Sequence, residues 1–257
     1  MENLRLALIQ QEIVPNNPQH NLNTFADVMS DLKNLDLIIL PEVFTTGFCS
    51  NARNYAEKID GSAYQWMAEQ AKKLNAVVTG SLVVKVDDEH FNRLVWMRPD
   101  GTYIHYDKRH LFRMAGEHER YACGNERVLV ELKGWRILPL ICYDLRFPVW
   151  SRNRNDYDLA IYVANWPSAR SLHWNRLLQA RAIENLSYIA GVNRVGMDEK
   201  HQHYSGDSCV FSPLGDVVFT SQEPGAFVVE LFADKLKEQR EKFPAYMDAD
   251  EFEIKLK

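Results

Sequence analysis

Two segments of this 257-residue sequence place charged side chains directly after runs that predict strands. Glu42 follows the apolar run 37–40 and Pro41. A carboxylate at such a strand end can accept and donate protons, whereas a lone glutamate is more often a helix cap or a surface residue. The segment 106–110 places Lys108 within a dense charged cluster that closes a predicted hairpin strand. A solvated turn is the alternative interpretation of that cluster.

A third segment, 138–148, carries Cys142 directly after an apolar run and ends at Pro148. Proline suits the first turn of a helix, so the pattern predicts a strand-to-helix elbow that aims the thiol out of the sheet. Backbone N–H groups at such an elbow can favour the thiolate, which is the nucleophilic form. The alternative is a small core residue, which is the role expected of the other cysteines, Cys49, Cys123 and Cys209.

The elements that must position these side chains alternate along the first half of the chain. Strands are predicted at 4–10, 37–40 and 76–86, with amphipathic helices between them. Ser62 and Gln65 have the spacing of a capping box that opens the second helix. A hairpin over 93–106 turns at a Pro-Asp-Gly sequence, because proline fixes φ and glycine accepts a positive φ.

The second half repeats this rhythm and adds further strands. A helix is predicted through 174–182, a charged helix at 233–242, and strands at 128–132, 135–141, 159–163, 188–192, 209–212, 217–220 and 226–231. Some strands are apolar on both faces and others alternate, which predicts an α/β fold with both helix-covered and sheet-on-sheet packing. Because no linker or repeat interrupts the chain, we predict one domain over 1–257 with a polar tail from about residue 244.

The composition is typical of an enzyme-sized globular chain, with 46% hydrophobic residues, 25% charged residues and a net charge of -5. The acidic balance disfavours a nucleic-acid or anionic-membrane partner. No apolar run approaches the roughly 18 residues of a membrane span. The N-terminus lacks the positive charge of a signal peptide and the four cysteines show no CxxC spacing, so we expect reduced thiols in a cytoplasm.

Three ordered motifs resemble the signatures of the carbon–nitrogen hydrolase (nitrilase) superfamily: LPE at 40–42, DKRHLF at 107–112 and ICYDLRFP at 141–148. The resemblance covers nearly the whole chain, because NWP at 165–167 and RAIEN at 181–185 also lie where that family has comparable segments. It implies a four-layer α-β-β-α sandwich and no cofactor.

The resemblance also implies a Glu-Lys-Cys triad. Carried over residue by residue, Cys142 is the nucleophile and Glu42 the general base and acid. Lys108 stabilises the tetrahedral intermediate, beside a backbone N–H that we expect to be that of Tyr143.

The family places a second glutamate before a Pro-Gly pair and against the lysine. Here Cys123 stands where the proline is expected, followed by Gly124. Counting back from Gly124, Glu117 is the better match and Glu119 the runner-up.

Further blocks, at 108–114, 143–152, 162–167 and 241–252, resemble the bacterial omega-amidase branch of the family. This resemblance implies hydrolysis of the small-molecule amides 2-oxoglutaramate or 2-oxosuccinamate to the 2-oxo acid and ammonia, through a cysteine thioester. The alternatives are an amidase acting on deaminated glutathione, an N-carbamoyl amidase, and a non-catalytic binding protein on the same scaffold.

Such a substrate carries a distal carboxylate, which an arginine fork or backbone N–H groups should bind. Arg146, Arg113 and Arg170 are the candidates, and an ion pair with Asp144 is the favoured alternative role for Arg146. Three aromatic residues are expected to wall the pocket unless they belong to the core, namely Phe44, Trp166 and Tyr143.

Two further expectations concern metals and assembly. His201 and His203 suggest an exposed loop rather than a metal site, because no third ligand lies nearby in the sequence. The family resemblance implies a homodimer that pairs its helical layers.

Overall fold

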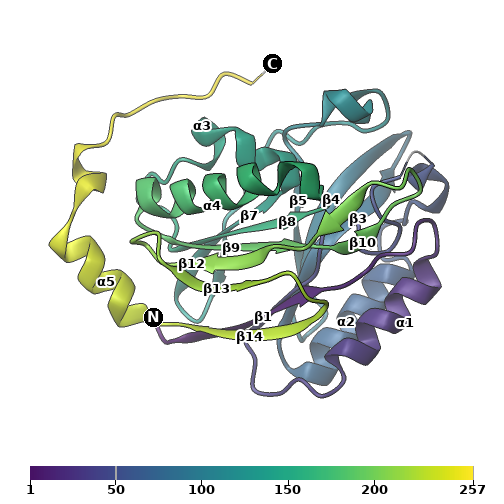
Figure 1. Cartoon of the computed structure of the whole chain (residues 1–257), viewed down its shortest axis with the longest axis horizontal. Coiled ribbons are helices and arrows are strands. Elements are labelled where there is room, and N and C mark those ends of the chain that lie inside the picture. The colour runs from purple at the N-terminus through teal and green to yellow at the C-terminus, as the bar shows by residue number, and fades with distance from the viewer. Residues whose placement is uncertain (50, 257) are drawn as a thin grey trace.

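The computed structural model describes residues 1–49 and 51–256. The chain forms four layers, in the order helices, sheet, sheet and helices (Figure 1). The first six-stranded sheet has the order β14 (Gly225–Leu231), β1 (Leu4–Gln10), β2 (Leu37–Ile39), β3 (Val77–Val86), β4 (Glu89–Met97) and β5 (Tyr103–Asp107). The second has the order β13 (Val217–Ser221), β12 (Ser208–Phe211), β9 (Tyr188–Asn193), β8 (Leu159–Ala164), β7 (Trp135–Ile141) and β6 (Val130–Leu132). This is the predicted four-layer α-β-β-α sandwich.

The central strands of both sheets pair in parallel, and the strand pairs towards the sheet edges are antiparallel. β1, β2 and β3 pair in parallel in the first sheet, as do β7, β8 and β9 in the second. Parallel neighbours require crossover connections, which the helices supply. α1 (Pro18–Met29) and α2 (Ser62–Leu74) lie together along one outer face in Figure 1, and α3 (Pro148–Ser151) and α4 (Ser171–Asn185) lie on the opposite side.

Strand β1 shows how the two buried layers divide the apolar side chains. Leu6 and Leu8 join the cluster between the sheets, whereas Ala7 and Ile9 join the cluster under α1 and α2. Because side chains alternate along a strand, a strand covered on both faces must be apolar throughout. The continuous apolar runs in the sequence follow from this geometry.

Several shorter elements complete the chain. A separate hairpin pairs β10 (Val195–Met197) with β11 (His203–Ser205), and α5 (Ala233–Lys242) follows β14. The 3-10 turns are Ala52–Tyr55, Arg113–Ala115, Glu117–Glu119, Cys142–Arg146, Ser168–Arg170 and Ala245–Asp248. Within the described ranges, no helix has both the length and the apolar character needed to cross a membrane.

Two local predictions are wrong. The N-cap of α2 is Gly61, and the Ser62 hydroxyl donates to Glu57 at 3.1 Å instead of forming a capping box. The hairpin strand predicted from residue 93 begins at Glu89, because β4 pairs along nearly all of β3. The second difference matters for the site, since it places Asn92 inside a strand.

Candidate active site

Lys108 lies at the centre of a buried ion cluster formed by the segments that follow β2 and β5. Its Nζ donates to Glu42 Oε1 at 2.8 Å and to the two carboxylate oxygens of Glu117 at 2.9 and 3.0 Å. All three side chains are at most 1% exposed. The solvated-turn interpretation of the segment around Lys108 is therefore wrong, and neither Glu42 nor Glu117 is a surface residue.

Cys142 directly follows β7 and begins the turn Cys142–Arg146 with a φ of +43°. A non-glycine residue adopts this left-handed backbone only where its surroundings impose it. Val43, next to Glu42, has a φ of +40°, which is rarer still for a β-branched residue. Both proposed reactive groups therefore sit at constrained turns, which fix where their side chains point.

The thiol of Cys142 faces the same cluster. Its Sγ donates to the carbonyl of Asn165 at 4.0 Å, a long contact suited to sulfur. Burial, followed by the charge of Glu42, raises the pKa of Cys142 well above its usual range, and Lys108 opposes this only in part. We expected the elbow to favour the thiolate, and this expectation is wrong: the resting residue is a thiol, so its proton must be removed during the reaction.

Lys108 and Glu117, in the same cluster, also have shifted pKa values. Burial alone would lower the pKa of Lys108, but Glu117 and Glu42 raise it well above the usual value. Lys108 is therefore an ammonium ion. Burial raises the pKa of Glu117 despite the opposing effect of Lys108. A fixed cation beside a neutral thiol suits stabilisation of an oxyanion that forms on a bound acyl group.

Two asparagines that sequence reasoning missed complete the site. The Asn92 amide donates to Glu42 Oε1 at 2.8 Å and to Glu117 Oε1 at 3.4 Å. The backbone N–H of Asn165 donates to Glu42 Oε2 at 2.8 Å, and its side chain donates to the Glu42 carbonyl at 2.6 Å. Both lie on or directly after strands, which was the available signal, although asparagine there is more often a turn residue.

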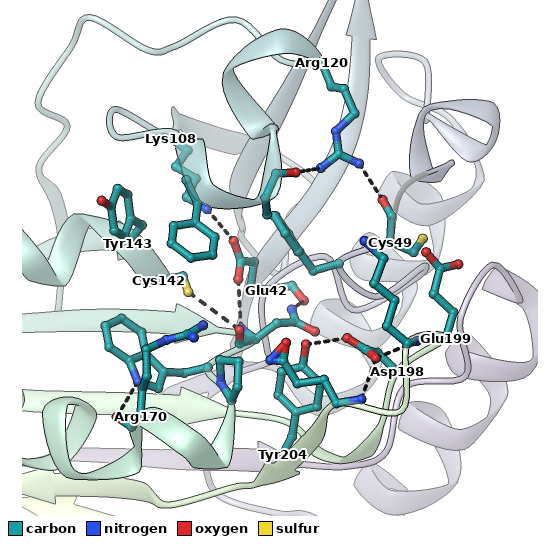
Figure 2. Close-up of a pocket in the computed structure, with 18 of the residues that line it drawn as sticks. Glu42, Cys49, Lys108, Arg120, Cys142, Tyr143, Arg170, Asp198, Glu199 and Tyr204 are labelled. Atoms are coloured by element: carbon teal, nitrogen blue, oxygen red, sulfur yellow. Dashed lines mark hydrogen bonds and ion pairs between the residues drawn. The ribbon is translucent and has the colours of Figure 1, made fainter.

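Part of this cluster lines one pocket (Figure 2). Cys142, Lys108 and Glu42 line it together with aromatic walls and the tip of the β10–β11 hairpin, which contributes Asp198, Glu199, Lys200 and Gln202. Asp198 stiffens this tip, because its carboxylate accepts from the backbone of Lys200 and Gln202 and from the Tyr204 hydroxyl. Cys49 also lines the pocket, and burial raises its pKa to about 11.

The structure brings some of the predicted substrate contacts to this pocket and leaves others outside. Tyr143, Trp166, Arg146 and Arg170 line it. Phe44 is fully buried against Phe25 and Trp66 under the first helical layer. Arg113 lies along a separate surface groove. Neither residue reaches the cysteine from its position.

Arg146 does not form the ion pair with Asp144 that the sequence favoured. Its guanidinium lies 4.9 Å from the Trp166 ring centroid and contacts His173 Nδ1 at 3.1 Å. Arg170 lies 5.5 Å from the Phe112 ring centroid. In the part of the chain that the structure describes, no carboxylate pairs with either guanidinium.

The structure also decides between the two candidates for the second glutamate and places the two histidines. Glu117 is in the ion cluster, whereas Glu119 is exposed beside His118. His201 and His203 are both exposed in the β10–β11 hairpin. Over residues 1–49 and 51–256, no group of three His, Cys, Asp or Glu side chains is placed to hold a metal ion.

A thiol, a carboxylate and an ammonium ion around one pocket are suited to acyl transfer through a covalent cysteine intermediate. The model of the carbon–nitrogen hydrolase family matches residues 5–237, and the chain belongs to this family. It is therefore a hydrolase of carbon–nitrogen bonds.

Individual relatives narrow the comparison. The chain is 50% identical to the omega-amidase YafV of Escherichia coli (strain K12), over 99% of this chain and 100% of the relative. It is 32% identical to the 2-oxoglutaramate amidase of Bacillus subtilis (strain 168), over 95% and 96% of the two chains. A crystal structure of a carbon–nitrogen hydrolase superfamily protein from Xanthomonas campestris, with an arsenic adduct in its active site, superposes with a TM-score of 0.98 at 45% identity, covering 99% of this chain and 100% of that one.

Proposed function

We propose that this chain is an omega-amidase that hydrolyses the terminal amide of 2-oxoglutaramate or 2-oxosuccinamate to the 2-oxo acid and ammonia. The observation that carries the proposal is the convergence of Cys142, Glu42 and Lys108 on one pocket, which also presents two arginines that pair with no carboxylate of the described residues. The near full-length similarity to an omega-amidase supports the choice of substrate class.

In the first half-reaction, Glu42 takes the Cys142 proton as the sulfur attacks the amide carbon. A carbon–sulfur bond forms and the carbonyl electron pair moves to oxygen. The oxyanion then faces the Lys108 ammonium and the backbone N–H of Tyr143. When the carbon–nitrogen bond breaks, Glu42 returns the proton to nitrogen, so ammonia leaves and a thioester remains.

In the second half-reaction, a water molecule attacks the thioester carbon and gives a proton to Glu42. The carbon–sulfur bond breaks, the proton passes to the Cys142 sulfur, and the 2-oxo acid leaves. Glu117 positions Lys108 and Asn92 positions Glu42 throughout, because Glu117 accepts from the Lys108 ammonium and the Asn92 amide donates to Glu42.

The distal carboxylate of the substrate binds Arg146 and Arg170. Both guanidiniums line the pocket beside aromatic rings, and no carboxylate among the described residues forms an ion pair with either of them. A guanidinium in such a partly buried place gains from a bidentate carboxylate partner. Tyr143 and Trp166 then border the carbon chain of the substrate.

A panel of amides with ammonia detection tests the function. We expect release from 2-oxoglutaramate and 2-oxosuccinamate, with little from deaminated glutathione or from N-carbamoyl compounds. Cys142→Ala should abolish release, and Cys49→Ala, which alters a thiol in the same pocket, should retain it. Turnover of a longer amide without turnover of 2-oxoglutaramate would assign a different amidase, and no turnover of any amide would favour the binding-protein alternative.

We also propose that the enzyme works as a homodimer in the cytoplasm. Val149 on α3 and Leu172 and Ile183 on α4 are 55%, 66% and 51% exposed, so the outer helical layer offers apolar side chains to a second copy. All four cysteines are free, as suits a reducing compartment. Sedimentation analysis should give twice the chain mass, and a monomer would refute the dimer. Fractionation of cells should recover the protein in the cytoplasmic fraction.

A further inference from the structure

A buried carboxylate behind the pocket joins the two sheets of the sandwich. Asp144 is fully buried in the turn that follows β7. Its Oδ2 accepts from the Tyr106 hydroxyl at 2.8 Å and from the Ile141 backbone N–H at 3.0 Å. Its Oδ1 accepts from the His110 backbone N–H at 3.0 Å and contacts His110 Nδ1 at 2.8 Å. Both oxygens therefore connect to the segment 106–110.

The positions of these partners bracket the proposed reactive groups. Tyr106 and His110 lie two residues before and two residues after Lys108. Ile141 immediately precedes Cys142, and Asp144 follows it by two residues. Lys108 comes from the end of the first sheet and Cys142 from the end of the second. The Asp144 carboxylate thus links the residues on both sides of Lys108 to the turn that carries Cys142.

The two side-chain partners of Asp144, Tyr106 and His110, each make further contacts. The Tyr106 hydroxyl accepts from Trp150 Nε1 at 3.1 Å and from the Arg109 backbone N–H at 3.2 Å. The His110 ring stacks on Phe147 with a centroid distance of 3.8 Å and an interplanar angle of 5°. Neither side chain can shift alone, because each is fixed by a second contact.

Asp144 does not line the pocket, so it cannot contact the substrate from its position. Its contact with the Ile141 N–H supports the backbone just before the left-handed Cys142. We propose that Asp144 is a positioning residue that sets where the Cys142 sulfur lies relative to Lys108 across the two sheets. The inference rests on the proposed amidase chemistry for its kinetic readout, and it assigns Asp144 a role beyond holding the fold together.

The first test compares two buried aspartates. Asp144→Asn keeps the shape but places an amide N–H against a donor, so the link between the sheets loosens. We expect kcat for 2-oxoglutaramate to fall roughly 10- to 100-fold with KM nearly unchanged, because misplaced reacting groups slow chemistry and leave substrate binding intact. The control is Asp158→Asn, since Asp158 is likewise buried and accepts from a backbone N–H, but its partners, Arg136 and Arg240, do not flank Lys108 or Cys142. It should lower thermal stability and leave kcat unchanged.

A second readout needs no substrate. The rate at which iodoacetamide labels Cys142, followed by peptide mass spectrometry, should fall about 10-fold in Asp144→Asn. In a Lys108→Ala background the same change should have an effect of less than about 3-fold, because two residues that act through one geometry are not additive. Equal effects in both backgrounds would mean a general structural role and would overturn the proposal.

A folded Asp144→Asn enzyme with unchanged kcat would also overturn it. If Asp144→Asn does not fold, Tyr106→Phe removes a single hydroxyl from the network and should lower kcat at constant KM; an unchanged kcat then overturns the proposal. If the wild-type protein hydrolyses no 2-oxo amide, the substrate assignment fails, while the labelling rates still decide the role of Asp144.

Discussion

Replacing Arg170 with alanine should separate recognition of the substrate carboxylate from the chemistry of amide cleavage. The guanidinium lies in the pocket, is only partly exposed, and is stacked at 5.5 Å from the Phe112 ring centroid. A hydrogen bond to a charged group contributes about 1.5–3 kcal/mol, and partial exposure favours the lower end. At about 1.4 kcal/mol for each factor of ten, kcat/KM for 2-oxoglutaramate should fall roughly 10- to 30-fold, mainly through KM.

The assay compares 2-oxoglutaramate with its methyl ester, in which the distal carboxylate is blocked. The ester should already be a poor substrate of the unmodified enzyme, and Arg170→Ala should lower its kcat/KM little further. Arg146→Ala should behave in the same way. Arg113→Ala is the matched control, because Arg113 lies along the other groove, and it should leave both substrates unaffected. Equal losses on acid and ester in Arg170→Ala would refute recognition of the carboxylate by this residue.

Three further outcomes follow from the site and its supports. Burial raises the pKa of Cys142 well above its usual range, so its alkylation rate should keep rising between about pH 7 and pH 9. Exposed Cys123 is the internal reference, and a plateau near neutrality would mean a preformed thiolate. Asn92→Ala removes the amide that donates to two buried carboxylates. Urea titration should show a free energy of unfolding lower by about 1–3 kcal/mol, and kinetics should show a lower kcat. An unchanged free energy of unfolding and an unchanged kcat would refute this role of Asn92. Gly124→Ala would place a Cβ against the Asp107 carbonyl oxygen, so calorimetry should show a destabilisation of about 1–3 kcal/mol. An unchanged Tm would contradict the close approach.

The bounds of helices and strands were predicted most accurately where the sequence pattern is clearest. β1, β7 and α5 have the predicted bounds, because each is a patterned run bounded by polar or turn residues. The β10–β11 hairpin was missed because its strands are three residues long and largely half-exposed or exposed, so they carry no clear alternation. Its contribution to the pocket was therefore also missed.

The site was predictable where a motif names the residue and unpredictable where partners come from distant segments. Glu42, Lys108 and Cys142 were each singled out from a strand end, and the structure brings them together. The Arg146–Asp144 pair was expected from proximity in sequence. It does not form, since Tyr106 and His110 reach Asp144 from the other sheet. Local spacing cannot reveal such competition.

The prediction of a thiolate at Cys142 was wrong for a related reason. The elbow and the nearby ammonium favour a thiolate locally, but burial and the charge of Glu42 outweigh them. Both of these depend on the closure of the two sheets around the site. The same closure brings Asn92 against Glu42 and Glu117, although the three residues are far apart in the chain.

Intact-mass spectrometry during turnover of 2-oxoglutaramate tests the central claim most directly. The account predicts a transient species heavier than the free chain by the mass of the 2-oxo acyl group. Peptide mapping should place this acyl group on Cys142, and Cys142→Ala should lack it. Steady ammonia release with no acyl adduct on quenching, or an adduct on another residue, would contradict a thioester at Cys142.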